Sequence, residues 1–212
     1  FLPLASEESD YDVMDRRIAV RRRDGAAIVS LTQNSYDLLG RLECTAVRMN
    51  PATFAAPPTS ACTPGTAGAD GPDRITRNYY DAAVQRIRTR VAIGTADEAD
   101  EEVRSYAPGG QLASVQDGEG NLTSFVYDGH GRLSQTRYPV PALGAMASSA
   151  TDYEGVSYDL AGRIIQRRLR DGQLIGYAYD ALGRQVTRDL PGAGADIASS
   201  YDLGGRLLQL SQ

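Results

Sequence analysis

The sequence contains no Lys: all 22 basic residues are Arg, against 27 Asp and Glu, which gives a net charge of -5. Proteins that bind nucleic acid usually present a basic surface that neutralises phosphates. The Arg clusters of this chain, such as residues 21–23, have acidic residues close by and no interleaved aromatic side chains that could stack on bases. We therefore expect no nucleic-acid partner.

Long apolar runs are also missing. No stretch of about 18 consecutive apolar residues occurs, so we expect no membrane span. The N-terminal stretch FLPLASEESD lacks both the basic start and the apolar core of a signal peptide, and we expect no attached one. The chain begins with Phe rather than Met, as a processed product or a piece of a longer protein would.

Side chains suited to catalysis or metal binding are scarce. His130 is the only His, and the chain has two Cys. A catalytic His needs an oriented partner and a nucleophile, and a zinc site needs about four ligands. Neither set can be assembled here, so we predict no catalytic residue, no metal site and no cofactor. Residues 117–121 (DGEGN) lack the length and the distal Glu of an EF-hand and are interpreted as a hairpin turn.

A short repeat dominates what is present. The motif Tyr-Asp-x-x-Gly-Arg occurs five times without a mismatch. Weaker copies begin at Tyr11, Tyr80 and Tyr106, and the copy at Tyr80 is read with one extra residue before Arg86. A unit of about 21 residues with insertions explains the intervals between these Tyr positions. The five exact copies consist of Tyr36, Asp37, Gly40 and Arg41; Tyr127, Asp128, Gly131 and Arg132; Tyr158, Asp159, Gly162 and Arg163; Tyr179, Asp180, Gly183 and Arg184; and Tyr201, Asp202, Gly205 and Arg206.

The residues between two motifs alternate as β-strands do. In residues 163–179, two alternating segments flank Asp171-Gly172, a dipeptide suited to a two-residue type I′ turn. In the next connection, Asp180 can accept backbone hydrogen bonds and Gly183 can adopt a positive φ. We therefore predict an all-β fold, an antiparallel β-meander with about two strands per 21-residue unit.

In such a meander the repeated Tyr and Arg fall at equivalent places on neighbouring units. Rings can then lie in a row with guanidinium groups across their faces, each contact contributing about 0.5 to 2 kcal/mol. The motif is interpreted as a structural staple whose Asp orients the turn. We treat residues 1–212 as a single array, with an inserted Pro-, Ala- and Gly-rich loop at 44–78 and a shorter inserted loop at 139–152.

The five exact copies, with an Asp-Gly hairpin halfway between successive Tyr positions, resemble the YD repeats of the Rhs family. The resemblance runs from Tyr11 to the end of the chain. In that family the repeats form a long β-sheet that spirals into a hollow shell around a toxic C-terminal domain. Relatives include the shell components of insecticidal Tc toxins and the animal teneurins. The resemblance therefore implies a curved or spiralling sheet, a section of a β-shell.

The resemblance also implies an exported bacterial protein, either secreted or at the cell surface, where disulfides are common. Cys44 and Cys62 bracket the first inserted loop. A disulfide between them would close a loop of about 19 residues and add about 3 kcal/mol. We favour this disulfide over two free thiols.

Two departures from the family pattern bear on function. Family shells are much longer than eight repeats and close with a segment around an Asp-Pro bond, which this sequence lacks. Nothing in the chain resembles a toxin domain, so any toxin activity is expected outside it. A wall of about sixteen strands would have open edges that need flanking sequence or partner chains.

The leading hypothesis is a non-enzymatic structural module, part of the wall of a shell that encapsulates or displays a toxin or effector domain. Its partners would be the remainder of a longer Rhs-type chain or its toxin domain. The alternative is a cell-surface binding module that contacts glycans or a partner protein through its sheet or its inserted loops. A third reading is one wall of an assembly built from several chains.

Overall fold

The computed structural model describes residues 5–192 and 196–212, and its elements are strands apart from one 3₁₀ helix, η1 (Pro51–Thr53). It divides into two compact units, residues 1–104 and 105–212, which we call unit 1 and unit 2. In the described part of the chain, no helix has the length and apolar character needed to cross a membrane. That both units form one array over residues 1–212 stays a prediction.

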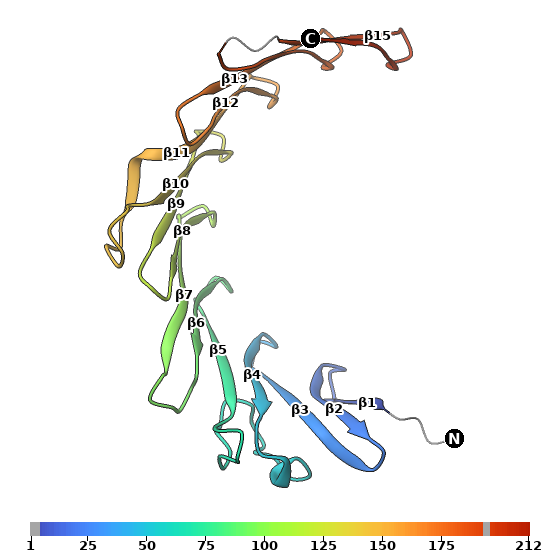
Figure 1. Ribbon diagram of the computed structural model, residues 1–212, viewed down its shortest axis with the longest axis vertical. Coiled ribbons are helices and arrows are strands. Elements are labelled where there is room, and N and C mark those ends of the chain that lie inside the picture. The colour runs from blue at the N-terminus through green and yellow to red at the C-terminus, as the bar shows by residue number, and fades with distance from the viewer. Residues whose placement is uncertain (1–4, 193–195) are drawn as a thin grey trace. The chain divides into compact units, whose positions relative to one another are not determined.

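Within each unit, every strand pairs antiparallel with the next strand along the chain (Figure 1). This order confirms the predicted all-β antiparallel meander. The strands of unit 1 are β1 (Ser6–Tyr11), β2 (Arg17–Asp24), β3 (Ala27–Tyr36), β4 (Leu42–Arg48), β5 (Arg74–Tyr80), β6 (Arg86–Val91) and β7 (Ala99–Tyr106), whose last two residues fall in unit 2. Unit 2 contains β8 (Leu112–Asp117), β9 (Leu122–Tyr127), β10 (Leu133–Pro139), β11 (Ser148–Tyr158), β12 (Ile164–Arg168), β13 (Leu174–Tyr179), β14 (Gln185–Asp189), β15 (Ile197–Tyr201) and β16 (Leu207–Ser211).

The Asp-Gly hairpin does not use the predicted type I′ turn. The N–H of Gly172 donates to the carbonyl of Leu169 at 2.9 Å, and the N–H of Leu169 donates to the carbonyl of Gln173 at 2.8 Å. Only Gly172 of the dipeptide has a positive φ (89°), whereas type I′ needs positive φ at both central residues. The loop is therefore a type I turn followed by one left-handed residue, Gly172. This arrangement keeps Asp171 out of the left-handed region, which costs energy for a residue other than Gly.

A β-bulge follows each motif turn. Ser157 lies opposite Gln166 and Tyr158 lies opposite Ile164, so Ile165 is an extra residue in the second strand. The same register shift follows the motif Tyr in the other hairpins for which the pairing is described. A left-handed Gly closing a three-residue hairpin loop commonly produces such a bulge. The alternation of side chains between the two sheet faces therefore shifts by one residue across each motif turn whose strand pairing is described.

The inserted loops are shorter than predicted. Residues 44–48 belong to β4 and residues 74–78 to β5, so the first loop covers 49–73. Residues 148–152 belong to β11, and Pro139 ends β10, so the second loop covers 140–147. The ladder continues through these residues because they pair with neighbouring strands despite their irregular sequence pattern.

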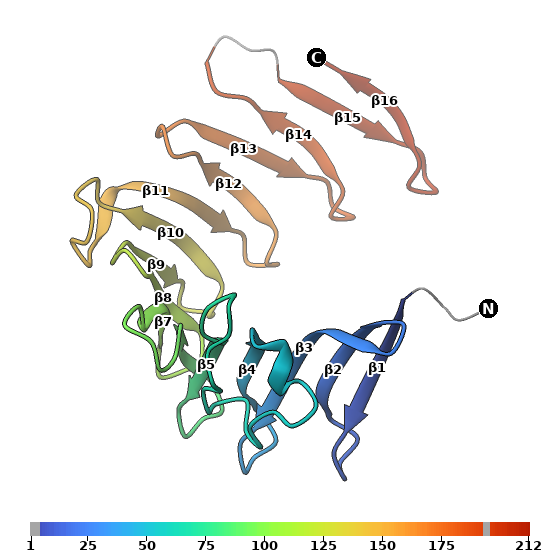
Figure 2. The ribbon, with the colours of Figure 1, turned by 60° about the horizontal axis from the view of Figure 1, so that its bottom comes forward.

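The first loop lies against the sheet of unit 1 (Figure 2) and contributes Phe54 and Ala61 to its core. Phe54 is buried against Ala19 and Leu31 on the sheet, and Ala61 is buried against a second group that includes Ile75. A single sheet needs another layer to bury an apolar face. In unit 2, Ile175 is the one buried hydrophobic residue among those described.

Candidate functional site

One carboxylate organises each exact motif turn. In the copy at 179–184, the Oδ1 atom of Asp180 accepts the N–H groups of Leu182 and Arg184, both at 2.9 Å. Its Oδ2 atom accepts the Nε–H of Arg184 at 2.7 Å. Gly183 has φ 80°, and its N–H donates to the carbonyl of Asp180 at 3.0 Å. The motif Asp thus orients the turn and also fixes the Arg side chain.

The same Asp–Arg contact recurs along the chain. The Nε to Oδ2 distance runs from 2.6 to 3.1 Å. The pairs are Asp12–Arg16, Asp37–Arg41, Asp128–Arg132, Asp159–Arg163, Asp180–Arg184 and Asp202–Arg206.

These hydrogen bonds lower the pKa of the carboxyl groups of Asp12, Asp37, Asp128, Asp159 and Asp180. The hydrogen bond from the Arg132 side chain, with N–H groups of Arg132 and His130, lowers the pKa of Asp128 to about 2. The backbone and side-chain hydrogen bonds of Arg184 likewise hold the pKa of Asp180 below its usual value. These carboxyl groups are therefore ionised at neutral pH and are unsuited to act as general acids.

The Arg of one copy lies over the Tyr ring of the next. The distance from the guanidinium carbon to the ring centroid is 4.4 to 4.8 Å, within the range of a cation–π contact. The pairs are Arg16 over Tyr36, Arg41 over Tyr80, Arg132 over Tyr158, Arg163 over Tyr179 and Arg184 over Tyr201. Tyr127 follows a weaker copy that has Gln111 in the Arg position.

The Tyr phenol makes a second contact with the preceding copy, which the sequence analysis missed. The O–H of Tyr179 donates to the carbonyl of Ile164 at 2.8 Å. Ile164 is the residue directly after the Arg of the preceding motif. Equivalent bonds of 2.8 to 3.1 Å join Tyr36 to Arg17, Tyr80 to Leu42, Tyr127 to Leu112, Tyr158 to Leu133 and Tyr201 to Gln185. In all six cases the accepting residue lies six positions after the Tyr of the preceding copy, and this constant spacing was the only signal in the sequence.

The weaker copy at Tyr80 was misread. Asp81 and Gln85 close a turn of the ordinary length, since the N–H of Gln85 donates to Oδ1 of Asp81 at 2.8 Å. Val84 occupies the position of the motif Gly with φ 68°. The copy therefore has no extra residue, and Arg86 begins β6 rather than closing the motif.

Cys44 on β4 and Cys62 in the first loop form a disulfide, with Cα atoms 5.2 Å apart. Cys44 is fully buried beside Ala61 and Ile75. The disulfide holds the middle of the loop against the sheet face at the point where the loop contributes to the core.

A buried ion pair closes the same loop at its base. Arg48 ends β4, and Asp73 is the last loop residue before β5; their side chains are 1 % and 3 % exposed, with Nη1 and Oδ2 2.6 Å apart. Arg48 also donates to the carbonyls of Ser60 and Thr63 at 2.9 and 2.8 Å. Burial alone would raise the pKa of Asp73, but hydrogen bonds from Arg48 and two backbone N–H groups outweigh it and hold the pKa below its usual value. The sequence analysis did not single out either residue.

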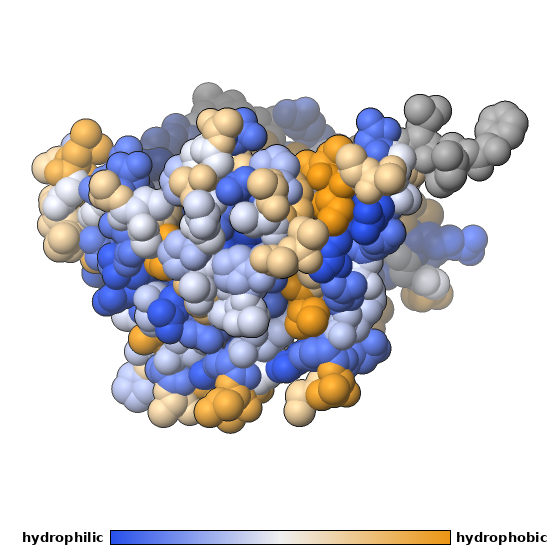
Figure 3. Space-filling model, turned by 90° about the horizontal axis from the view of Figure 1, so that it is seen from below, coloured by the Kyte–Doolittle hydropathy of each residue, from blue (hydrophilic) through white to orange (hydrophobic). Residues whose placement is uncertain are grey.

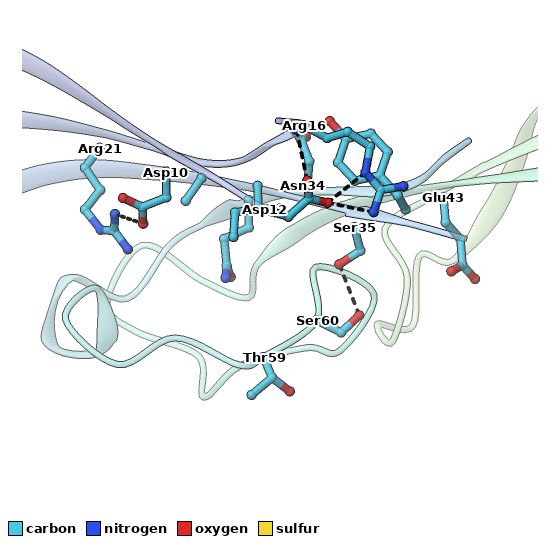
Figure 4. A pocket seen from close by; sticks show the side chains of 13 residues that line it. Asp10, Asp12, Arg16, Arg21, Asn34, Ser35, Glu43, Thr59 and Ser60 are labelled. Carbon is cyan, nitrogen blue, oxygen red and sulfur yellow. Dashed lines mark hydrogen bonds and ion pairs between the residues drawn. The ribbon is translucent and has the colours of Figure 1, made fainter. Parts of the chain in front are cut away.

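A polar cavity of about 360 Å³ lies between the sheet of unit 1 and the loop (Figure 4). Its charged side chains are already paired: Asp10 with Arg21, Asp12 with Arg16, and Glu43 with Arg77. Ser35 and Ser60 meet across it with their hydroxyl oxygens 3.3 Å apart. The face shown in Figure 3 carries hydrophobic surface only in separate patches among hydrophilic side chains.

The remaining sequence candidates lie in turns. His130 is exposed in a motif turn, where its N–H donates to Asp128. Residues 117–121 form a hairpin turn in which Asp117 accepts the N–H groups of Glu119 and Asn121. Within residues 5–192 and 196–212, no three His, Cys, Asp or Glu side chains gather in a way that could hold a metal ion.

Comparisons with known proteins were made for both sequence and fold. The family model "RHS Repeat" matches residues 108–140 and 158–195. The chain matches the crystal structure of TcdB2-TccC3-Cdc42 with a TM-score of 0.52, and the structure of a Photorhabdus luminescens Tc holotoxin pore carrying a TccC3 mutation with a TM-score of 0.51. Each match has 14 % identity and covers 97 % of this chain but 14 % of the other. No curated protein matches the sequence.

At 14 % identity, the structural matches establish a common fold and nothing more. The family model, in contrast, matches the residues that contain the exact motif copies at Tyr127, Tyr158 and Tyr179. The sequence resemblance is therefore confirmed. The motif copies and the family model together identify residues 108–140 and 158–195 as RHS repeats, in a chain that has the β-sheet fold of the matched structures.

Proposed function

We propose that this chain is a non-enzymatic structural module, a stretch of the wall of a shell that encapsulates or displays a toxin or effector domain of an exported bacterial Rhs-type protein. The observation that carries the proposal is that the motif side chains make structural contacts within their own turn and with the neighbouring copy. The Asp of each exact copy holds its own turn, and the Arg and Tyr hold neighbouring copies together, so these groups build a wall.

The matched structures and the disulfide support this proposal. The solved structures that share the fold contain Tc toxin components, and this chain spans 14 % of the length of the chains it matches. The disulfide is consistent with an oxidising compartment and hence with export. The toxin or effector domain would lie in other parts of a longer protein, which is its proposed partner.

The test uses the natural gene product, isolated from its producing cells and medium. Its intact mass shows whether these residues belong to a longer chain, and partial proteolysis shows whether the rest of that chain is protected. Gly183→Val forces a β-branched residue to φ 80° and should open the wall, so the rest of the chain should be digested faster. Leu182→Ala, at an exposed position of the same turn, is the matched control. A product of only 22.7 kDa, or digestion that is equal in both variants, would overturn the encapsulation proposal.

A second candidate function is glycan binding at the cell surface, which the open polar cavity beside Tyr36 favours. A sugar would hydrogen-bond to side chains such as Asn34 and stack on exposed ring surface. A glycan array probes this function directly, with Asn34→Ala and Thr59→Ala, both in the cavity lining, as the variants. Binding that neither variant reduces would exclude this cavity as the site.

A further inference from the structure

The second inserted loop, residues 140–147 of unit 2, has no polar side chain. Its sequence is VPALGAMA. Leu143 is 81 % exposed and Met146 is 67 % exposed, and the loop projects beyond the ends of β10 and β11 (Figure 1). Surface turns are ordinarily rich in Gly, Pro, Asn, Asp and Ser, whose side chains tolerate water. An exposed loop that is apolar throughout therefore indicates a contact with an apolar partner.

The backbone of this loop is held in a fixed shape. The N–H of Val140 donates to the carbonyl of Ala147 at 3.1 Å and closes the loop at its base. The N–H of Met146 donates to the carbonyl of Gly120 in the adjoining hairpin turn, also at 3.1 Å. Met146 has φ 50°, in the left-handed region, which costs energy for a residue other than Gly. A long apolar side chain is thus present where Gly would fit better, which favours a role for the side chain itself.

An aromatic ring and a guanidinium group lie at the base of the loop. Tyr138 is two residues before the loop, and the guanidinium carbon of Arg170 lies 4.1 Å from the centroid of its ring. Arg170 also donates to both carboxylate oxygens of Asp152, at 2.8 and 2.6 Å, and its side chain is 56 % exposed. Tyr and Arg beside an apolar tip are typical of segments that enter a membrane surface, where these side chains lie at the level of the head groups.

The charges near the loop balance one another. Arg170 is paired with Asp152, and Arg137, the last basic residue before the loop, is offset by Glu119 in the adjoining turn. Attraction to anionic lipid takes a cluster of about four to eight Lys and Arg, which this balance does not provide. The loop therefore fits a bilayer of zwitterionic lipid, where burial of apolar surface alone drives binding. A protein partner fits less well, because the loop has no side-chain donor or acceptor that could specify it.

We propose that loop 140–147 inserts into the surface of a zwitterionic lipid bilayer. Leu143 and Met146 enter the boundary between head groups and acyl chains, to a depth of about 5 to 10 Å, and Tyr138 and Arg170 lie at the head groups. Binding is weak and reversible, because one loop buries little apolar area. β10 and β11 are each paired on both sides, so further repeats at either end of the array leave this contact unchanged. The inference goes beyond the proposed function and is independent of any toxin cargo.

Flotation of the natural gene product with phosphatidylcholine vesicles tests this contact. We expect the protein to float with the vesicles at millimolar lipid and to stay bound when the salt concentration is raised, because no charge attraction is involved. Leu143→Asp should weaken the partition about tenfold or more, since it replaces an apolar side chain at the tip with a charge. Leu160→Asp is the matched control. Leu160 is 103 % exposed in the motif turn at the opposite end of β11, and its substitution should leave binding unchanged.

Met146→Gly separates a role in binding from a role in folding. It removes an apolar side chain and relieves the left-handed backbone, so the melting temperature should not fall while vesicle binding weakens several-fold. Three results would each overturn the proposal: no flotation with phosphatidylcholine, equal losses in Leu143→Asp and Leu160→Asp, or binding that requires anionic lipid and disappears at high salt. Encapsulation is measured separately by mass and proteolysis, so these results leave the proposed function untouched.

Discussion

The substitution Arg48→Ala tests how much the buried ion pair stabilises unit 1. It removes a guanidinium that lies 2.6 Å from Asp73 and donates to two loop carbonyls. The carboxylate of Asp73 would stay buried with only its backbone N–H partners. Removing one member of a buried ion pair typically costs about 3 to 5 kcal/mol. That is a large part of the total of about 5 to 15 kcal/mol by which most domains are stable.

The matched control is Arg22→Ala. The side chain of Arg22 is 71 % exposed, and its ion pair with Glu7 has an N to O distance of 3.2 Å. Pairs of this kind contribute about 0 to 1 kcal/mol. Both variants keep the disulfide, so the comparison isolates the ion pair from the covalent attachment of the loop.

The assay is urea unfolding of the oxidised protein followed by circular dichroism, with digestion of loop 49–73 by a protease of broad specificity as a local readout. We expect Arg48→Ala to lower the free energy of unfolding of unit 1 by several kcal/mol more than Arg22→Ala and to expose the loop. If both variants lose less than about 1 kcal/mol, the ion pair does not fasten the loop to the sheet and the reasoning is refuted.

Four further predictions follow from the contacts described above. Reduction of the disulfide should lower the free energy of unfolding by about 3 kcal/mol, measured by urea unfolding with and without dithiothreitol. Tyr179→Phe should cost about 0.5 to 1.5 kcal/mol because it removes the phenol bond to the preceding copy but keeps the ring, whereas Tyr177→Phe, the control, should cost less. Val84→Gly should raise the melting temperature, since φ 68° strains a β-branched residue; an unchanged or lower value would contradict that strain. Because the pKa of Asp128 is lowered to about 2, its ionised form stabilises the fold above its ordinary pKa of about 4, and this stability should be lost as the pH falls from about 4 to about 2; an Asp128 carboxyl resonance that titrates near pH 4 would refute this assignment.

The fold could be predicted because the residues of each motif indicate a turn without reference to any distant contact. Asp180 and Gly183 can be assigned to a turn from local chemistry alone, and the alternation between turns then predicts strands. Because the motif repeats, these local predictions of turns and strands together predict an antiparallel meander. The number of strands followed from the number of hairpins.

The features that the sequence did not predict depend on the strand register or on a contact between residues far apart in the sequence. The bulge at Ile165 is one residue inserted into an otherwise regular strand, and no residue type marks it. Val84 hid a motif of ordinary length because a β-branched residue is not expected at positive φ. Arg48 and Asp73 are 25 residues apart, and only the folded loop shows that both are buried. Composition alone made that loop look like an open insertion.

The side chains at the two middle positions of each motif turn are not needed to form the turn. Asp, Gly and Arg set the turn, while side chains such as Val13, Leu38 and Leu203 extend almost wholly into solvent. Evolution can therefore rewrite these dipeptides one at a time without disturbing the strands behind them. For protein engineering, the turns offer a regularly spaced set of display positions along one edge of each unit, into which short recognition sequences could be substituted.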